Sequence, residues 1–213
     1  MLHPRTNLIL KDGTDRITTQ ADAVTLDIGA IRQGDTPSNA IHARITNPRD
    51  GLIRHELSTV DRSVTCVLLT ATSLPQDLRD ADIELRRREL ELNLNPGHIG
   101  LIPEICTAVA FTRLPQLLKA IDRLSSVTLD IEALSADLGV PNSHARSLQE
   151  PLLSQMAIHA SSMNLKWSVA APSFDHSERA ILATRAHALG ASGIHVTNEV
   201  EVAGFNSLFS SNH

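Results

Sequence analysis

Short runs of aliphatic residues recur along the chain, separated by longer stretches of mixed apolar and polar residues. Most runs have four to seven residues and are rich in Val, Ile and Leu, which is typical of strands buried on both faces of a parallel sheet. Eight parallel strands are the number that closes a β/α barrel. The runs predict strands at residues 7–10, 23–27, 40–45, 64–70, 99–103, 127–129, 167–171 and 193–196.

The stretches between these runs show the apolar spacing of amphipathic helices, most clearly in the second part of the chain. Helices are predicted at residues 75–93, 107–124, 145–163 and 175–189. Pro115 is expected to break or restart the second of them, because proline lacks a backbone N–H. The last helix begins near Asp175, a residue type that caps helix N-termini, and ends before Gly190, which suits the position after a helix.

The connection between the second and third predicted strands lacks such a helix. Residues 29–39 contain Gly34 and Pro37 and show no helical period, whereas a parallel crossover usually needs a dozen or more residues. Complete TIM-type barrels have about 250 residues. The sequence therefore predicts an α/β fold in which residues 1–213 form one domain, a shortened TIM-type (β/α)8 barrel. We expect the helix after strand 2 to be missing and one flank to be open.

The composition and charge of the chain argue against nucleic-acid and membrane partners. The net charge is −5 with dispersed Lys and Arg, which argues against a nucleic-acid surface. The basic cluster from Arg86 to Arg88 lies in a Glu-rich helix, where a pair of Glu84 with Arg88 is expected. No apolar stretch approaches 18 residues and no signal peptide is apparent, so we expect no membrane span and a cytoplasmic protein. Cys66 and Cys106 lack metal-ligand or disulfide spacing.

One segment carries a family resemblance. Residues 95–108, NPGHIGLIPEICTA, resemble a segment ending in Glu-Thr-Ala of the citrate-lyase β-subunit or HpcH/HpaI aldolase family, which includes malyl-CoA and citryl-CoA lyases. Further stretches resemble that family in the same order, at residues 7–17, 21–27, 42–48, 67–78, 127–139 and 188–195. The resemblance implies a phosphoenolpyruvate/pyruvate-domain-like barrel, a homo-oligomer, and a Mg²⁺ ion that polarises a keto-acid or enolate oxygen during carbon–carbon cleavage.

The positions that hold magnesium in the family carry other residues here. The family's glutamate and aspartate ligands correspond to Cys106 and Ala133, and its lysine corresponds to Ala71. A thiol is poorly matched to Mg²⁺, and an alanine cannot bind it. Asp27 and Arg44 are retained, and the family's arginine fixes a substrate carboxylate, a task suited to a planar guanidinium. We therefore expect a degenerate member without a resident cofactor.

Arg44, Asp27, Thr70 and Asp130 are the candidate substrate-binding residues, because they stand at the predicted carboxyl ends of strands, where barrel active sites lie. For Arg44 the alternative is a structural salt bridge to Asp27. In the alternative interpretation, the carboxylates at strand ends face solvent or pair with Arg113 or Arg123.

Arg44, Glu104, Cys106 and His195 are the candidate catalytic residues. Glu104 suits a general base, and Cys106 a nucleophile, although buried free cysteines are commonly small apolar residues. His195 suits an acid or base, and its alternative role is to hold the last loop through a hydrogen bond.

Three functions stay open at this point. The first is a repurposed, metal-independent lyase, isomerase or cyclase of specialised biosynthesis. Its substrate would be an anionic or carbonyl-bearing small molecule, for example a carboxylate or a molecule linked to CoA or to a carrier. The second is Mg²⁺-dependent cleavage or condensation of a malyl- or citryl-CoA-type thioester, with Glu104, Asp130 and Glu132 as shifted ligands. The third is a non-catalytic binding or subunit protein, most simply a homo-oligomer.

Overall fold

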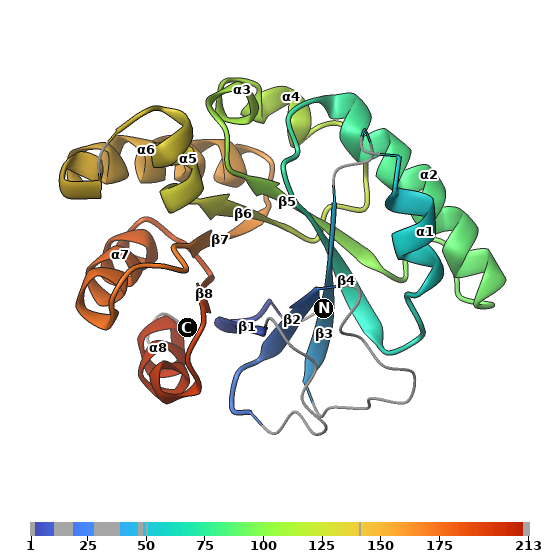
Figure 1. Cartoon of the computed structure of the whole chain (residues 1–213), viewed down its shortest axis with the longest axis horizontal. Coiled ribbons are helices and arrows are strands. Elements are labelled where there is room, and N and C mark those ends of the chain that lie inside the picture. Colours follow the sequence, from blue (N-terminus) through green and yellow to red (C-terminus); the bar gives the residue numbers. More distant parts are fainter. Residues whose placement is uncertain are drawn as a thin grey trace.

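The structure is a computed structural model that describes residues 3–10, 19–27, 39–46, 49, 51–140 and 142–210. Eight parallel strands form a closed barrel in which each strand pairs with the next and β8 pairs with β1 (Figure 1). The strands are β1 (Thr6–Leu10), β2 (Ala23–Asp27), β3 (Ala40–Ile45), β4 (Val64–Leu69), β5 (Gly100–Ile105), β6 (Ser126–Asp130), β7 (Lys166–Ala170) and β8 (Gly193–Val196). The predicted barrel is confirmed, and the strand ends differ from prediction by at most two residues.

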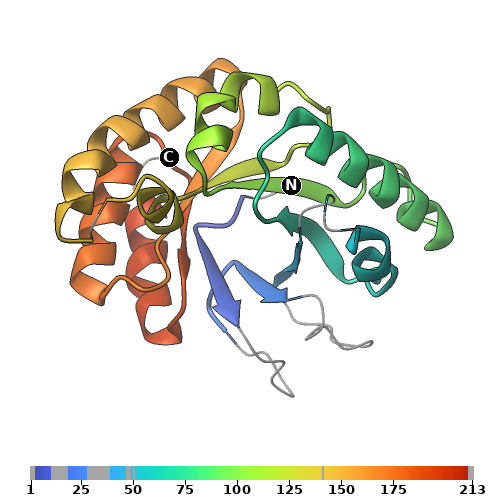
Figure 2. The same ribbon diagram turned by 45° about the horizontal axis from the view of Figure 1, so that its top comes forward.

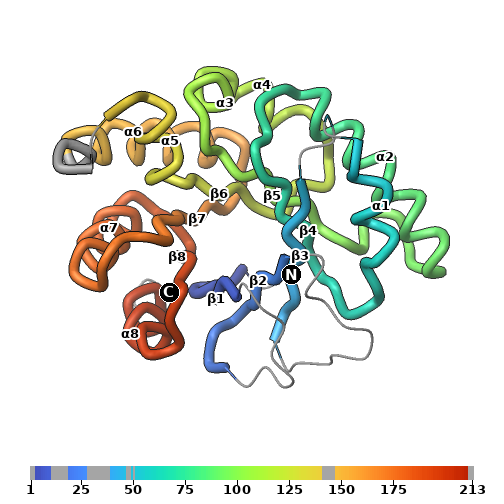
Figure 3. Tube along the Cα trace, viewed as in Figure 1, coloured from blue at the N-terminus to red at the C-terminus, as the bar shows by residue number. Residues whose placement is uncertain are grey.

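Helices pack around much of the barrel (Figures 2 and 3). They are α1 (Ile53–Ser58), α2 (Pro75–Glu91), α3 (Ala108–Thr112), α4 (Leu114–Leu117), α5 (Ile131–Asp137), α6 (Asn142–Ser162), α7 (His176–Ala188) and α8 (Val202–Ser210), with a 3₁₀ turn at Glu199–Glu201. Helix α8 lies beside β1 and β8, α1 beside β3 and α2 to α7 around β4 to β7, and strand and helix alternate from β3 onward. None of the described helices is long and apolar enough to cross a membrane.

Three of the four predicted helices are confirmed, and the helix predicted at residues 107–124 was too long. As expected, Pro115 breaks the helix predicted at residues 107–124: it sits in the first turn of α4 and cannot continue α3. Helix α4 ends at Leu117, before the predicted end. Asp175 caps α7 as predicted, accepting the Glu178 backbone N–H at 2.8 Å, and Gly190 has the left-handed φ of 89° that follows a helix end. The short helices α1 and α5, and α8, were not predicted.

The connection predicted to lack a helix, residues 28–38, lies outside the described residues. The strands that flank it are described, and their outward side chains Val24, Leu26, Ile41 and Ala43 are at most 1% exposed. The expectation of an open flank was therefore wrong at β2 and β3, because the outer face of both strands is covered.

The two faces of the strands have opposite chemistry. Outward residues such as Leu8, Val67 and Trp167 join one large aliphatic cluster under the helices. The inward apolar cluster is small and consists of Cys66, Leu68 and Ile102. Most other inward positions are polar, glycine or alanine: Asn7, Thr25, Asp27, His42, Arg44, Gly100, Glu104, Ser126, Thr128, Asp130, Lys166, Ser168 and His195. TIM barrels usually fill this space with branched aliphatic residues, so this interior is polar by comparison.

A buried ion-pair cluster joins α2 to the loop before β5. The Glu89 carboxylate accepts hydrogen bonds from Arg123 Nη1 at 3.1 Å and Nη2 at 3.0 Å, and from the backbone N–H groups of Gly97 at 2.9 Å and Ile99 at 2.8 Å. Arg123 Nε also contacts Asp82. Because every oxygen of Glu89 is paired twice, this cluster holds the loop in place.

The basic cluster on α2 forms ion pairs, although not the predicted one. Glu84 pairs with Arg87 at 2.9 Å, and Arg88 pairs with Glu91 at 3.0 Å. Arg88 also donates to the Val60 carbonyl at 2.9 Å and 2.7 Å. The contact with Val60 turns Arg88 away from Glu84, so the prediction of a Glu84–Arg88 pair was wrong.

Candidate active site

Four of the predicted site residues lie at the carboxyl ends of their strands on the inner side of the barrel. Arg44 is the penultimate residue of β3, beside Asp27 of β2, and Glu104 and Asp130 stand at or near the ends of β5 and β6. Arg44 Nη2 lies 3.4 Å from Glu104 Oε2, and this pair reaches across the barrel over the intervening strand β4. We call Asp27, Arg44, Glu104 and Asp130 the carboxyl-end cluster. Within the described chain, Arg44 pairs with Glu104 and not with Asp27.

Glu104 is the most strongly buried carboxylate of this cluster. Its side chain is 5% exposed, whereas that of Arg44 is 34% exposed. Burial raises the pKa of Glu104 most, Asp130 and Asp27 add to the rise, and Arg44 opposes it. The net result is a carboxyl group that takes up a proton more readily than an ordinary glutamate. Such a group suits general acid–base chemistry.

Asp130 has a structural contact in addition to its place in the cluster. Its Oδ1 accepts the Ala133 backbone N–H at 2.9 Å and so caps α5. Burial is the main reason why the pKa of Asp130 is raised, and Glu132 contributes to the rise. Glu132 itself turns away, because its Oε2 accepts the Ser173 backbone N–H at 2.8 Å in the loop after β7.

Cys106 and Thr70 follow β5 and β4 and lie near the cluster. Burial raises the pKa of the Cys106 thiol to about 11, and Glu104 contributes to the rise. The sulfur is therefore a protonated thiol at neutral pH, which argues against the nucleophile hypothesis. The Thr70 hydroxyl donates to the Ile45 carbonyl at 3.1 Å, so its proton is already used within the fold. Ala71, at the position of the family's lysine, has a left-handed φ of 50°.

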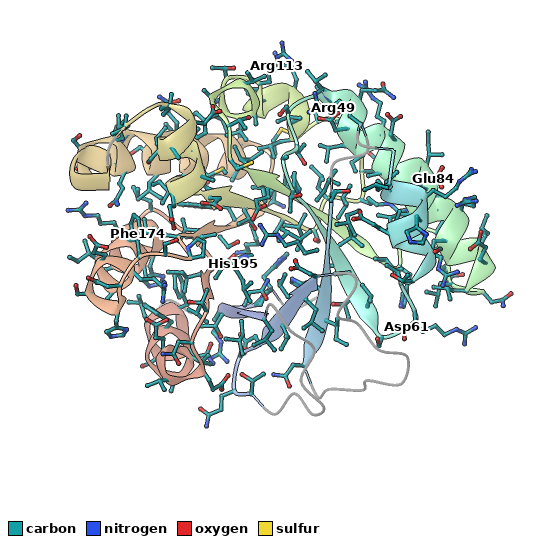
Figure 4. The ribbon with its side chains drawn as sticks, in the orientation of Figure 1. Arg49, Asp61, Glu84, Arg113, Phe174 and His195 are labelled. Carbon is teal, nitrogen blue, oxygen red and sulfur yellow. The ribbon has the colours of Figure 1, made fainter. Side chains whose placement is uncertain are left out.

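His195 lies inside the barrel on β8 (Figure 4). Its Nε2 lies 3.3 Å from both the Thr128 and the Ser168 hydroxyls, while its Nδ1 is buried and has no partner among the described residues. Burial, with help from His42 and Arg44, lowers the pKa of His195 to about 3. β8 has the predicted bounds, His195 is its penultimate residue, and its ring is buried in the interior.

The interior polar layer was not predicted as a unit. The His42 ring Nδ1 contacts Asn7 Nδ2 at 3.1 Å, and the Thr25 hydroxyl donates to Asn7 Oδ1 at 2.8 Å. Burial lowers the pKa of His42 to about 4, so the ring is neutral directly below Arg44. The signal for this layer was present in the sequence: a polar residue occupies a middle position of several otherwise aliphatic strands.

The described residues do not fit a magnesium ion as they stand. Mg²⁺ prefers hard oxygen ligands in octahedral geometry, and the two positions that match the family's ligands hold the protonated thiol of Cys106 and the methyl group of Ala133. The shifted set is not gathered either, since Glu104 contacts Arg44, Asp130 caps α5 and Glu132 binds Ser173. In the described part of the chain, no three His, Cys, Asp or Glu side chains come together in a way that could hold a metal.

Fold and cluster together define a class, a parallel β/α barrel with an arginine–carboxylate pair at the carboxyl end of its strands. Among solved structures, RipC from Yersinia pestis matches with a TM-score of 0.75 at 17% identity, over 96% of this chain and 94% of that chain. A citrate lyase from Burkholderia xenovorans LB400 matches with a TM-score of 0.78 at 13% identity, over 98% and 78%. CitE from Mycobacterium tuberculosis, solved with magnesium and acetate, matches with 0.70 at 16% identity, over 98% and 92%.

These structural neighbours include citrate-lyase proteins, the family that the sequence motifs resemble. At such identities the likeness establishes the shared fold and no more. No family model and no curated protein matches the sequence.

Proposed function

We propose that the carboxyl-end cluster binds a small anionic, carbonyl-bearing molecule, and that Glu104 exchanges a proton with it in a lyase-like reaction. The observation that carries the proposal is the geometry of the Arg44–Glu104 pair. A guanidinium has five N–H donors, and among the described residues Arg44 makes one contact, at 3.4 Å. Arg44 therefore has donors to spare for a carboxylate, in the paired geometry that guanidinium groups favour.

Glu104 supplies the second part of the proposal. It is a buried carboxyl group with a raised pKa, beside a cation that an incoming anion would also approach. An anion bound to Arg44 adds negative charge near Glu104 and weakens the hold of Arg44 on it, and both effects raise the pKa of Glu104 further. Glu104 then takes up a proton as the ligand binds, and this proton is available to a developing enolate or alkoxide oxygen.

The class of reaction rests on the structural neighbours, several of which are named citrate lyases or aldolase-family proteins. The sequence resemblance implies chemistry at a keto-acid or enolate oxygen, which suits the pairing of Arg44 with a proton-transfer group. We propose that this chain works without the family's metal, because Cys106 and Ala133 stand at the ligand positions.

Calorimetric titration with pyruvate and with oxaloacetate tests the proposal. In the wild type, we expect the binding heat near pH 7 to change with the ionisation enthalpy of the buffer, because a proton is taken up. Glu104→Gln should still bind but lose this buffer dependence. Arg44→Met should bind roughly 10- to 100-fold more weakly, the effect of losing hydrogen bonds to a charged group.

The matched control is Arg54→Met. Arg54 also makes a single 3.4 Å contact with a glutamate, Glu84, but on the outer surface, so its loss should leave binding unchanged. Buffer dependence that survives in Glu104→Gln would show that another group takes up the proton. An increase of affinity or turnover with added Mg²⁺ would favour the metal-dependent alternative.

A further inference from the structure

The amino end of the barrel holds a large cavity that the carboxyl-end cluster does not use. Its volume is about 1110 Å³, in the range of cavities that hold metabolite-sized ligands. It is lined by residues at or just before the amino ends of the strands, and it reaches inward to His42 and Ile102. A smaller interior cavity of about 10 Å³, room for about one water molecule, lies beyond it and shares His42 and Ile102 as lining residues.

One wall of this cavity carries hydrogen-bond donors without protein partners. Ser126 and Lys166 are neighbours in the pairing register of β6 and β7, at the amino end of both strands. Inward and outward positions alternate along these strands, so both side chains share the face of Thr128 and Ser168. Lys166 is exposed to solvent where it lines the cavity. No described residue forms an ion pair with Lys166 or a hydrogen bond with the Ser126 hydroxyl.

His3 belongs to the same wall. It lines both cavities, and its pKa is lowered first by burial and then by the charge of Lys166, which places the two side chains close together. The acid of the cavity, Asp22, is already held by Arg5, whose Nε and Nη2 each lie 2.8 Å from a carboxylate oxygen. Among the described residues that line the cavity, Lys166 therefore carries a positive charge that no described carboxylate pairs with.

We propose that this amino-end cavity is a second binding site, for a small organic anion whose carboxylate or phosphate group lies on Lys166, Ser126 and His3. The body of the ligand packs on Ile102, Ala40 and Cys66, which give the inner part of the cavity apolar surface. Carboxylate and phosphate share the chemistry that this wall recognises, namely negative oxygen acceptors facing an ammonium group and neutral donors. The proposal is independent of the function assigned to the opposite end of the barrel.

Matched probes of the same apolar body test the site. Thermal unfolding of the intact chain is followed at constant ionic strength with phenyl phosphate, benzoate and phenol. We expect at least one of the two anions to raise the unfolding temperature in a saturable way, and phenol to have no such effect. The anion that binds more tightly shows whether the site prefers a phosphate ester or a carboxylate.

Variants then assign the binding to this wall. Lys166→Ala should weaken the anion at least tenfold and Ser126→Ala a few-fold, whereas Lys166→Arg should retain most of the affinity. Lys119→Ala removes an exposed lysine beside α4, and this variant should bind the anions as the wild type does. Equal binding of phenol and the anions, no binding at all, or wild-type affinity in Lys166→Ala would overturn the proposal. A loss of binding in Arg44→Met with no loss in Lys166→Ala would show that the anion binds at the carboxyl end of the barrel instead.

Discussion

Two buried glutamates of this barrel each meet an arginine, and the two pairs are built in opposite ways. Glu89 accepts two hydrogen bonds from Arg123 and two from backbone N–H groups, all between 2.8 and 3.1 Å. Glu104 has one contact with Arg44, at 3.4 Å. Both glutamates are buried, with side chains 0% and 5% exposed. The two glutamates are about equally buried, but Glu89 is fully hydrogen-bonded and Glu104 has a single long contact.

The difference follows from what burial of a charge requires. A carboxylate loses several kcal/mol of hydration when it is buried, and only close, multiple hydrogen bonds offset that loss. Glu89 has them, so the ion pair with Arg123 is a structural element. Glu104 does not, and its raised pKa is the consequence. A sparsely paired carboxyl group keeps the capacity to exchange protons and to respond to a ligand.

A third pair supports this distinction. Arg179 of α7 contacts Glu201 and donates to the carbonyls of Pro172 at 3.1 Å and Phe174 at 2.6 Å, and Glu201 also contacts His176 at 2.9 Å. This network fastens α7 to the segment before α8, outside the barrel. The two fully paired clusters therefore join helices and loops, and the sparsely paired one lies at the carboxyl end, where barrel active sites occur.

The largest effect is expected when the fully paired cluster is broken. Arg123→Met keeps most of the side-chain volume but leaves Glu89 buried without its cation, which should lower the free energy of unfolding by roughly 3–5 kcal/mol. Urea unfolding at pH 7 measures the change. Arg54→Met, which removes an exposed pair with Glu84, should cost less than about 1 kcal/mol. A loss below 1 kcal/mol for Arg123→Met would contradict the structural role.

An intermediate effect of opposite sign is expected for Glu104→Gln. The pKa of Glu104 is raised in the folded state above the ordinary value of 4.5. The carboxyl group therefore stabilises the fold below pH 4.5, and this contribution is lost as the pH rises through the folded pKa. Each unit of difference corresponds to about 1.4 kcal/mol.

The neutral amide avoids this loss, so Glu104→Gln should be more stable than the wild type at pH 7.5, with the advantage disappearing at pH 4. Urea unfolding at both pH values is the measurement. Glu89→Gln is the matched control and should be less stable than the wild type at pH 7.5. A Glu104→Gln protein destabilised equally at both pH values would mean that Glu104 is a well-paired structural group.

The contrast between the two pairs is not visible in the sequence, although the fold is. Aliphatic runs such as 23–27 and 40–45 predicted their strands to the residue, because a strand buried on both faces leaves a strong pattern. The break at Pro115 between α3 and α4 was predicted, whereas the end of α4 at Leu117 was not, since local periodicity does not show where a crossover ends. Arg44 was predicted at a strand end, yet its partner Glu104 lies 60 residues away and depends on the barrel register.

Other site residues show which kind of information was missing. Asp130 and Glu132 stand two residues apart, and an extended backbone would place both on one face. The chain instead starts α5 at Ile131, so Asp130 becomes its cap and Glu132 reaches the β7–α7 loop. In each case the residue was identified, and its direction was decided by where a strand stops and the next helix starts.

The smallest effect on stability is expected for Arg44→Met, and it sharpens the comparison most. Removing the cation from a fully paired, buried carboxylate such as Glu89 is costly. Glu104 can take up a proton instead, because its pKa is already raised and rises further without Arg44. Arg44 is also partly exposed and makes one long contact, so its loss should cost less than about 1 kcal/mol at pH 7. Urea unfolding of Arg44→Met and Arg123→Met side by side measures the ratio, and losses of similar size would show that both pairs serve the fold alone.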